Sequence, residues 1–158
     1  MVEDRDEAVQ ARLLVERVAQ EVREELGGRV AEAILIANSI KIGLMIESKT
    51  AVQNRADIMS HADFVNVGLN DLVNDVRGVS DRSGILTLAN TNVSLEVISM
   101  LPLLLESARE SGIELCLCGE WAGNMGIVLN AINAAAQIEG SNLSFATRLV
   151  RIPMLKSL

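Results

Sequence analysis

The sequence predicts an α/β fold with parallel strands, and three observations support this prediction. Short apolar segments alternate along the chain with segments of helical periodicity, which is the pattern of successive strand–helix units. Polar residues directly follow the apolar segments, as at the carboxyl ends of strands in parallel sheets. Aromatic residues make up only 2% of the chain, so the core between sheet and helices must be aliphatic.

The first segment, residues 5–26, is predicted to be a charged helix that ends at Gly27 and Gly28. Its charged side chains are expected to form a solvated face. Its apolar residues recur at helical spacing: Ala11, Val15, Val18, Val22 and Leu26. Residues 29–40 are short and apolar, and the pattern leaves helix and strand open there. We therefore expect an amino-terminal helix over residues 1–28 and a second unit over 29–158.

The second unit is predicted to hold four strand–helix repeats. The predicted strands are 42–46, 64–68, 113–118 and 143–146. The predicted helices are 51–60, 70–76, 94–110 and 121–138, with a short helical end at 150–157. Pro102 should either kink its helix or mark its first turn. Residues 77–93 lack periodicity, and long loops of this kind in α/β folds are more often functional than filler.

Polar residues gather where the predicted strands end, at Glu47, at Asn70 and Asp71, and at Cys118 to Glu120. In a (β/α)8 barrel this end of the strands carries the active site. A whole barrel needs eight strands and roughly 250 residues. The sequence therefore predicts half of a TIM-type barrel, about four βα units, preceded by the charged helix. A half-barrel leaves two strand edges unpaired, which favours pairing with a second copy or with the missing half.

Strand periodicity also predicts which side chains share a face. If Glu47 points into the barrel, Met45 and Gly43 do so too, and Leu44 and Ile46 face the helices. If Cys118 points inward, Cys116 shares that face, and the intervening leucines pack against helices.

The composition excludes several classes of function. The net charge of −7 argues against a surface for nucleic acid or anionic membranes, which require basic patches. Two cysteines and one histidine make a poor zinc site. The acidic, polar amino terminus does not resemble a signal peptide, and the apolar run at 31–36 is too short to span a membrane. A reducing cytoplasm is the expected location.

Four motifs occur in a characteristic order over residues 40–157. They are M-I-E at 45–47, D-F-V-N-V-G-L-N-D-L at 63–72, C-G-E-W-A-G at 118–123, and a last stretch from Phe145 to I-P-M-L-K at 152–156. Together they resemble the carboxyl-terminal barrel of the phosphoenolpyruvate (PEP)-utilising phosphotransferases. This family includes enzyme I of the sugar phosphotransferase system, pyruvate phosphate dikinase and PEP synthase. Its members show M-[IV]-E, D-F-F-S-[IF]-G-T-N-D-L, C-G-E-x-A-G and I-P-x-x-K.

The resemblance implies a site for PEP or pyruvate with Mg²⁺ as the cofactor. Glu47 and Asp71 would be the magnesium ligands, as oxygen donors that leave positions for substrate oxygens. Cys118 would be the general acid that protonates the enolate of pyruvate, which requires a neutral thiol. The residues that would contact the substrate are Asn70, Arg82, Gly119 and Glu120.

The chain departs from the family pattern at several positions. Leu69 replaces a threonine, Ser48-Lys49 replaces Thr-Pro, and Asn124 replaces an aspartate. A His-Pro pair is missing from residues 91–94. The amino-terminal half of the barrel, with two further phosphate-binding arginines, and the phosphohistidine domain also lie outside this sequence. We therefore expect the chain to need these parts for phosphoryl transfer.

Alternative interpretations stay open at this point. Asp71 could cap the helix that begins near Leu72, and Cys118 alone could be a small buried side chain. Trp121 should cover the barrel mouth or pack on a helix. The whole chain could be a non-catalytic half-barrel that forms a homodimer or binds a partner. It could also be a magnesium-dependent lyase that acts on pyruvate enolates.

Overall fold

A computed structural model describes residues 2–25, 40–78 and 91–147 of the chain. In these residues, four parallel strands form one sheet in the order β1-β2-β3-β4. The strands are β1 (Gly43–Ile46), β2 (Phe64–Gly68), β3 (Glu114–Cys118) and β4 (Leu143–Ala146). Because sequential strands are neighbours and all run in the same direction, the sheet has the layout of part of a TIM-type barrel. The predicted α/β fold is confirmed.

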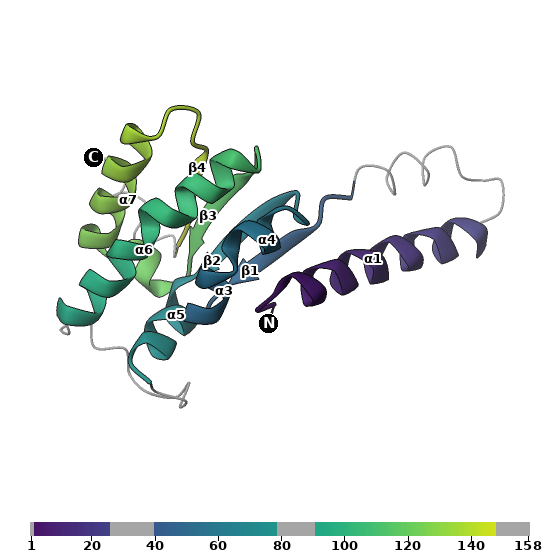
Figure 1. The fold of residues 1–158 in the computed structure, drawn as a ribbon, viewed down its shortest axis with the longest axis horizontal. Helices are drawn as coiled ribbons and strands as arrows, with labels where there is room; N and C mark the ends of the chain where they lie inside the picture. Colours follow the sequence, from purple (N-terminus) through teal and green to yellow (C-terminus); the bar gives the residue numbers. More distant parts are fainter. Residues whose placement is uncertain (1, 26–39, 79–90, 148–158) are drawn as a thin grey trace.

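Helices connect the strands and cover one face of the sheet, as Figure 1 shows. The described helices are α1 (Arg5–Glu25), α3 (Lys49–Gln53), α4 (Arg55–Met59), α5 (Leu69–Val76), α6 (Thr91–Glu110), the 3₁₀ turn η1 (Glu120–Gly123) and α7 (Met125–Gln137). The segment left open at 29–40 and the helical end expected at 150–157 lie mainly outside the described residues. So does most of the aperiodic stretch at 77–93.

The alternation of buried and exposed residues in the strands agrees with the predicted faces. The side chains on the helix-covered face are fully or almost fully buried: Leu44, Ile46, Val65, Val67, Leu115 and Leu117. On the opposite face, Met45 is exposed, and Asn66, Cys116 and Cys118 are only partly buried. This second face corresponds to the interior of a barrel, and none of the described helices covers it.

Two predicted helices are interrupted by asparagines. The helix expected at 51–60 is two short helices, because Asn54 closes α3 by donating its backbone N–H to Thr50 and then begins α4. The helix expected at 121–138 is η1 followed by α7. Asn124 separates them in an extended conformation, and its side chain accepts from the N–H of Ile127 (3.2 Å). The Asn124 cap is a local side-chain effect that hydrophobic periodicity does not report, whereas no side-chain cap bond is present at Asn54.

Helix α6 begins three residues earlier than predicted and contains Pro102 in its interior. The alternative that Pro102 marks the first turn is therefore wrong. Trp121 is buried in the core, where η1 contacts α5 and α7. Of the two predicted positions for this side chain, packing on a helix is the observed one.

Helix α1 is attached to the body near its amino-terminal end. Arg12 donates to the carbonyl oxygen of His61 (2.9 Å) and forms an ion pair with Asp63 (3.1 Å). The side chain of Asn54 donates to the carbonyl oxygen of Glu3 (2.8 Å). Beyond these contacts α1 extends away from the sheet (Figure 1), and its apolar residues from Leu13 to Val22 are largely exposed. The boundary predicted at residue 28 lies outside the described residues and stays a prediction.

Candidate ligand site at the carboxyl ends of the strands

The residues singled out from the sequence lie at one edge of the sheet. Glu47 directly follows β1, and Asn70 and Asp71 lie in the first turn of α5, directly after β2. Cys118 ends β3, and Gly119 and Glu120 form the turn that follows it. Because the four strands are parallel, all these residues lie at the carboxyl ends of neighbouring strands. Arg82 lies outside the described residues.

The Glu47 side chain lies against the end of the neighbouring strand. A Cβ atom placed on Gly68, the last residue of β2, would come within 2.9 Å of Glu47 Oε2 and 3.0 Å of Glu47 Cβ. Any larger side chain at position 68 would displace Glu47. Gly68 therefore allows the Glu47 carboxylate to lie over the end of β2. Helix α5, which contains Asp71, begins directly after this strand.

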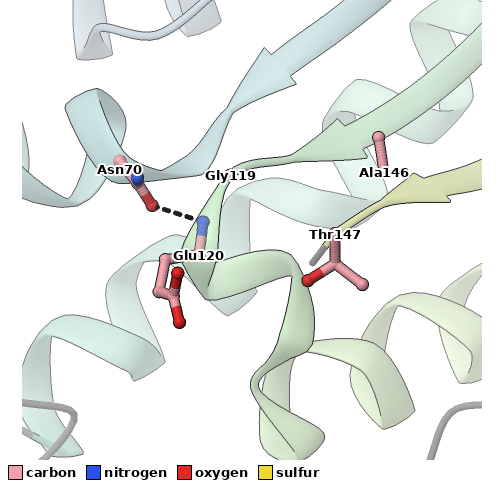
Figure 2. Close-up of a pocket in the computed structure, with 5 residues that line it drawn as sticks. All are labelled: Asn70, Gly119, Glu120, Ala146 and Thr147. Atoms are coloured by element: carbon pink, nitrogen blue, oxygen red, sulfur yellow. Dashed lines mark hydrogen bonds between the residues drawn. The ribbon is translucent and has the colours of Figure 1, made fainter. Parts of the chain in front are cut away.

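Asn70 connects the ends of β2 and β3. Its Oδ1 accepts hydrogen bonds from the backbone N–H groups of Glu120 (2.9 Å) and Trp121 (3.3 Å), and Figure 2 shows the first of these. The neighbouring Gly119 has φ of 98° and ψ of −178°, a backbone conformation that only glycine adopts readily. A Cβ atom there would lie 2.9 Å from Asn70 Oδ1. Glycine at 119 and asparagine at 70 therefore depend on each other.

A pocket of about 420 Å³ opens beside this turn (Figure 2). It is lined by Asn70, Gly119, Glu120, Ala146 and Thr147. Three of these residues were predicted to contact a substrate. Ala146 and Thr147 were not, although their position at the end of the last predicted strand was a usable signal. The pocket therefore spans the carboxyl ends of β2, β3 and β4.

Cys118 lies beside the pocket, directly before the Gly119 turn. Its Sγ donates to the carbonyl oxygen of Val67 (3.3 Å). Burial raises the pKa of the Cys118 thiol, and the nearby Cys116 and the Glu47 carboxylate raise it further. A raised pKa keeps this thiol protonated at neutral pH, which is the state that a proton donor requires.

Two carboxylates are the candidate donors for a hard metal ion. Glu47 and Asp71 follow adjacent strands, and both are partly buried. Within the described ranges, no three His, Cys, Asp or Glu side chains gather in a group that could hold a metal. Two carboxylates still fit Mg²⁺, which usually takes few protein ligands and completes its shell with water and substrate oxygens. Asp71 lies within the first turn of α5, whose N-cap is Gly68, so the predicted capping role is wrong.

Comparison with known proteins identifies the family. The family model for the PEP-binding domain of PEP-utilising enzymes matches residues 1–151. The chain belongs to the PEP-utilising enzyme family. The resemblance inferred from the four motifs is thereby confirmed. None of the helices in the described part of the chain is long and apolar enough to cross a membrane.

The similar curated proteins are phosphotransferases of much greater length. The PEP-dependent phosphotransferase system protein of Escherichia coli K12 is 34% identical over 126 residues, which are 78% of this chain and 16% of that protein. The PEP-protein phosphotransferase of Haemophilus influenzae is 24% identical over 154 residues, 97% of this chain and 24% of the relative. The chain thus spans a quarter or less of these PEP-utilising relatives.

A solved structure supports the barrel architecture. The chain superposes with a TM-score of 0.62 on a HpcH/Hpal aldolase/citrate lyase family protein from Burkholderia cenocepacia J2315, at 15% identity. The match covers 99% of this chain and 60% of that protein. At this identity the likeness shows the fold alone.

The departures from the pattern of PEP-utilising enzymes have local structural roles. Ser48 is the N-cap of α3 and accepts from the N–H of Ala51 (3.1 Å), as a threonine would. Lys49 has a backbone N–H, which the family proline lacks. This N–H donates to the Asp75 carboxylate of α5 (2.7 Å). Leu69, in place of the family threonine, is fully buried. The segment after Glu47 is therefore tied to α5 by a bond that the Thr-Pro version cannot form.

Proposed function

We propose that this chain forms the magnesium-binding and enolate-protonating side of a PEP/pyruvate site in a phosphotransferase. The observation that carries the proposal is the pocket at the carboxyl ends of β2, β3 and β4. Cys118 directly precedes the Gly119 turn that lines it, and Glu47 lies against the end of β2 and acts on the Cys118 thiol. Membership of the PEP-binding domain family supports this choice of ligand. The two carboxylates of Glu47 and Asp71 are also consistent with a magnesium site.

Each residue has a defined role in the proposed mechanism. Glu47 and Asp71 would hold Mg²⁺, which neutralises charge on the carboxylate and phosphate oxygens of PEP. Asn70, Gly119 and Glu120 would shape and contact the substrate. Arg82 is proposed at the phosphate because a planar guanidinium matches phosphate oxygens.

Cys118 would act after the phosphoryl group has left PEP for a histidine. The P–O bond electrons remain on the enolate of pyruvate. The Cys118 thiol would then transfer its proton to the methylene carbon, which gives pyruvate and a thiolate. The raised pKa of the Cys118 thiol suits this role, because the thiol stays protonated until the enolate forms and the thiolate readily regains a proton.

Phosphoryl transfer would require parts that lie outside this sequence. The remaining strands of a barrel would pair with β1 and β4, the edge strands of the sheet in the described residues, and supply further phosphate ligands. A separate domain would provide the accepting histidine. The relatives' much greater length supports such parts, whether on the same chain or on another.

Calorimetry with Mg²⁺ and oxalate, an enolate mimic, tests the proposal. The amino-terminal barrel half of a similar phosphotransferase is supplied in a parallel titration. Oxalate should bind in a magnesium-dependent way, and Glu47→Gln or Asp71→Asn should abolish the binding. Asp57→Asn, which changes an exposed carboxylate on α4, is the matched control. The proposal fails if wild-type protein binds no oxalate even with the other barrel half present.

Self-association is a second candidate. It is favoured by the two edge strands that have no further partner among the described residues, and by the exposed Met45 on the face that no described helix covers. In this version the chain is a non-catalytic half-barrel. Light scattering separates the candidates, because a monomer that binds oxalate contradicts self-association.

A further inference from the structure

The hydroxyl group of Thr147 is buried without a hydrogen-bond partner. Its Oγ1 is covered by surrounding atoms, yet no group in the described part of the chain donates to it or accepts from it. A buried polar group in this state costs free energy, and such groups are uncommon in folded proteins. No feature of the four family motifs assigns a role to this residue.

Thr147 lies in the wall of the pocket on the β4 side of the glycine turn. The register of the sheet pairs Cys118 with Ala146, so Thr147 lies one position beyond, beside Gly119. In the view of Figure 2, the hydroxyl oxygen of Thr147 is on the side toward Gly119 and Glu120, and the methyl group is turned away. The residue as a whole is only partly buried, and threonine has more than one accessible χ1 rotamer. A change from one staggered χ1 rotamer to another would bring the hydroxyl to the pocket surface.

Two backbone donors of the turn beside the pocket are already used. The N–H groups of Glu120 and Trp121 both donate to Asn70 Oδ1. The ionised Glu120 side chain only accepts. Side-chain donors for an anionic ligand line this pocket on two sides: the Asn70 amide nitrogen on the β2 side and the Thr147 hydroxyl on the β4 side.

We propose that Thr147 is a ligand-binding residue whose hydroxyl donates a hydrogen bond to an anionic oxygen of the PEP or pyruvate ligand. This inference rests on the proposed function, because it concerns the same pocket. Bonds from a hydroxyl to a charged oxygen are short and strong. The ligand would satisfy the hydroxyl that the free protein leaves unpaired.

The test compares Thr147→Val, which removes the hydroxyl at nearly constant shape, with Thr147→Ser, which keeps it. Oxalate is titrated in the presence of Mg²⁺, with the other barrel half supplied. Thr147→Val should weaken oxalate binding roughly 10- to 100-fold, the effect of one hydrogen bond to a charged group. Thr147→Ser should bind close to wild type.

A ligand-free measurement distinguishes binding from a structural role. The urea midpoint of Thr147→Val should equal or exceed that of wild type, since the valine removes an unsatisfied buried group. A clear fall in the midpoint would mean that the hydroxyl stabilises the free protein, and it would overturn the proposal. If wild type binds oxalate and Thr147→Val binds it equally well, the assignment of Thr147 fails and the proposed function stands. If wild type does not bind, both fail.

Discussion

Replacing Gly119 with alanine should destabilise the protein by more than its backbone conformation alone explains. The φ of 98° and ψ of −178° lie in a region that costs a non-glycine residue about 1–3 kcal/mol. The new Cβ would also lie 2.9 Å from Asn70 Oδ1, so the Asn70 side chain must move. That movement weakens the bonds to the N–H groups of Glu120 and Trp121, each contributing about 0.5–1.5 kcal/mol. We expect a total loss of about 2–5 kcal/mol.

Gly112→Ala is the matched control for this experiment. Gly112 also has a positive φ, of 68°, but a Cβ atom added there would meet no atom within 4 Å. Its substitution should cost only the left-handed backbone penalty of about 1–2 kcal/mol. Urea unfolding of the two variants measures the difference. Equal losses in the two variants would refute the coupling of Gly119 to Asn70.

Three further predictions concern neighbouring groups. Asn70→Ala should lower the free energy of unfolding, measured in urea, by about 1–3 kcal/mol. Asn70→Asp should lower it less, because aspartate keeps an oxygen that accepts from the Glu120 N–H. Equal losses in the two variants would contradict this role of Asn70. Asp75→Ala should lower the free energy of unfolding by about 1–2 kcal/mol in the wild type. In a Lys49→Pro background the same change should have little effect, since proline has no N–H to donate to Asp75. If the loss is the same in both backgrounds of this double-mutant cycle, the bond between Lys49 and Asp75 does not contribute to stability. The raised pKa of Cys118 means that, above the ordinary thiol pKa, the unfolded chain releases a proton that the folded chain keeps. The free energy of unfolding should therefore fall as pH rises from the ordinary to the raised pKa, and Cys118→Ser should remove its part of that slope; the same slope in both proteins would contradict the assignment.

Strand positions could be predicted well because their burial follows a period of two. Leu44 and Ile46 pack under the helices, and Met45 between them is exposed. The same alternation in β3 places Cys116 and Cys118 on the open face. A register error of one residue would reverse the pattern, so the apolar residues alone determine which face carries the site.

Helix boundaries and pocket walls were harder to predict, for two physical reasons. Asn124 begins α7 through a hydrogen bond from a nearby backbone N–H to its side chain, which competes with the hydrophobic period. The break at Asn54 involves no side-chain cap bond, and the Asn54 side chain instead donates to the distant carbonyl oxygen of Glu3. Thr147 enters the pocket only because β4 pairs with β3 in a particular register. That register joins residues almost thirty positions apart, so the local sequence indicates where β4 ends but not which residues its end faces. The positions of residues 47, 70 and 118–120 could be predicted because each lies at the end of its strand or within two residues of it. Their roles in the site stay predictions.

Helix α5 links the site residues on both sides of it. Through Asp75 it holds the start of α3, two residues after Glu47, and through Asn70 it holds the turn after Cys118. Asp71 lies between these two contacts on the same eight-residue helix. The geometry of the proposed magnesium ligands and proton donor therefore depends on bonds within this half of the barrel. Under the proposed function, further barrel strands would add phosphate ligands to residues that this helix already holds together, so magnesium and oxalate binding should be less sensitive to the absence of those strands than phosphoryl transfer.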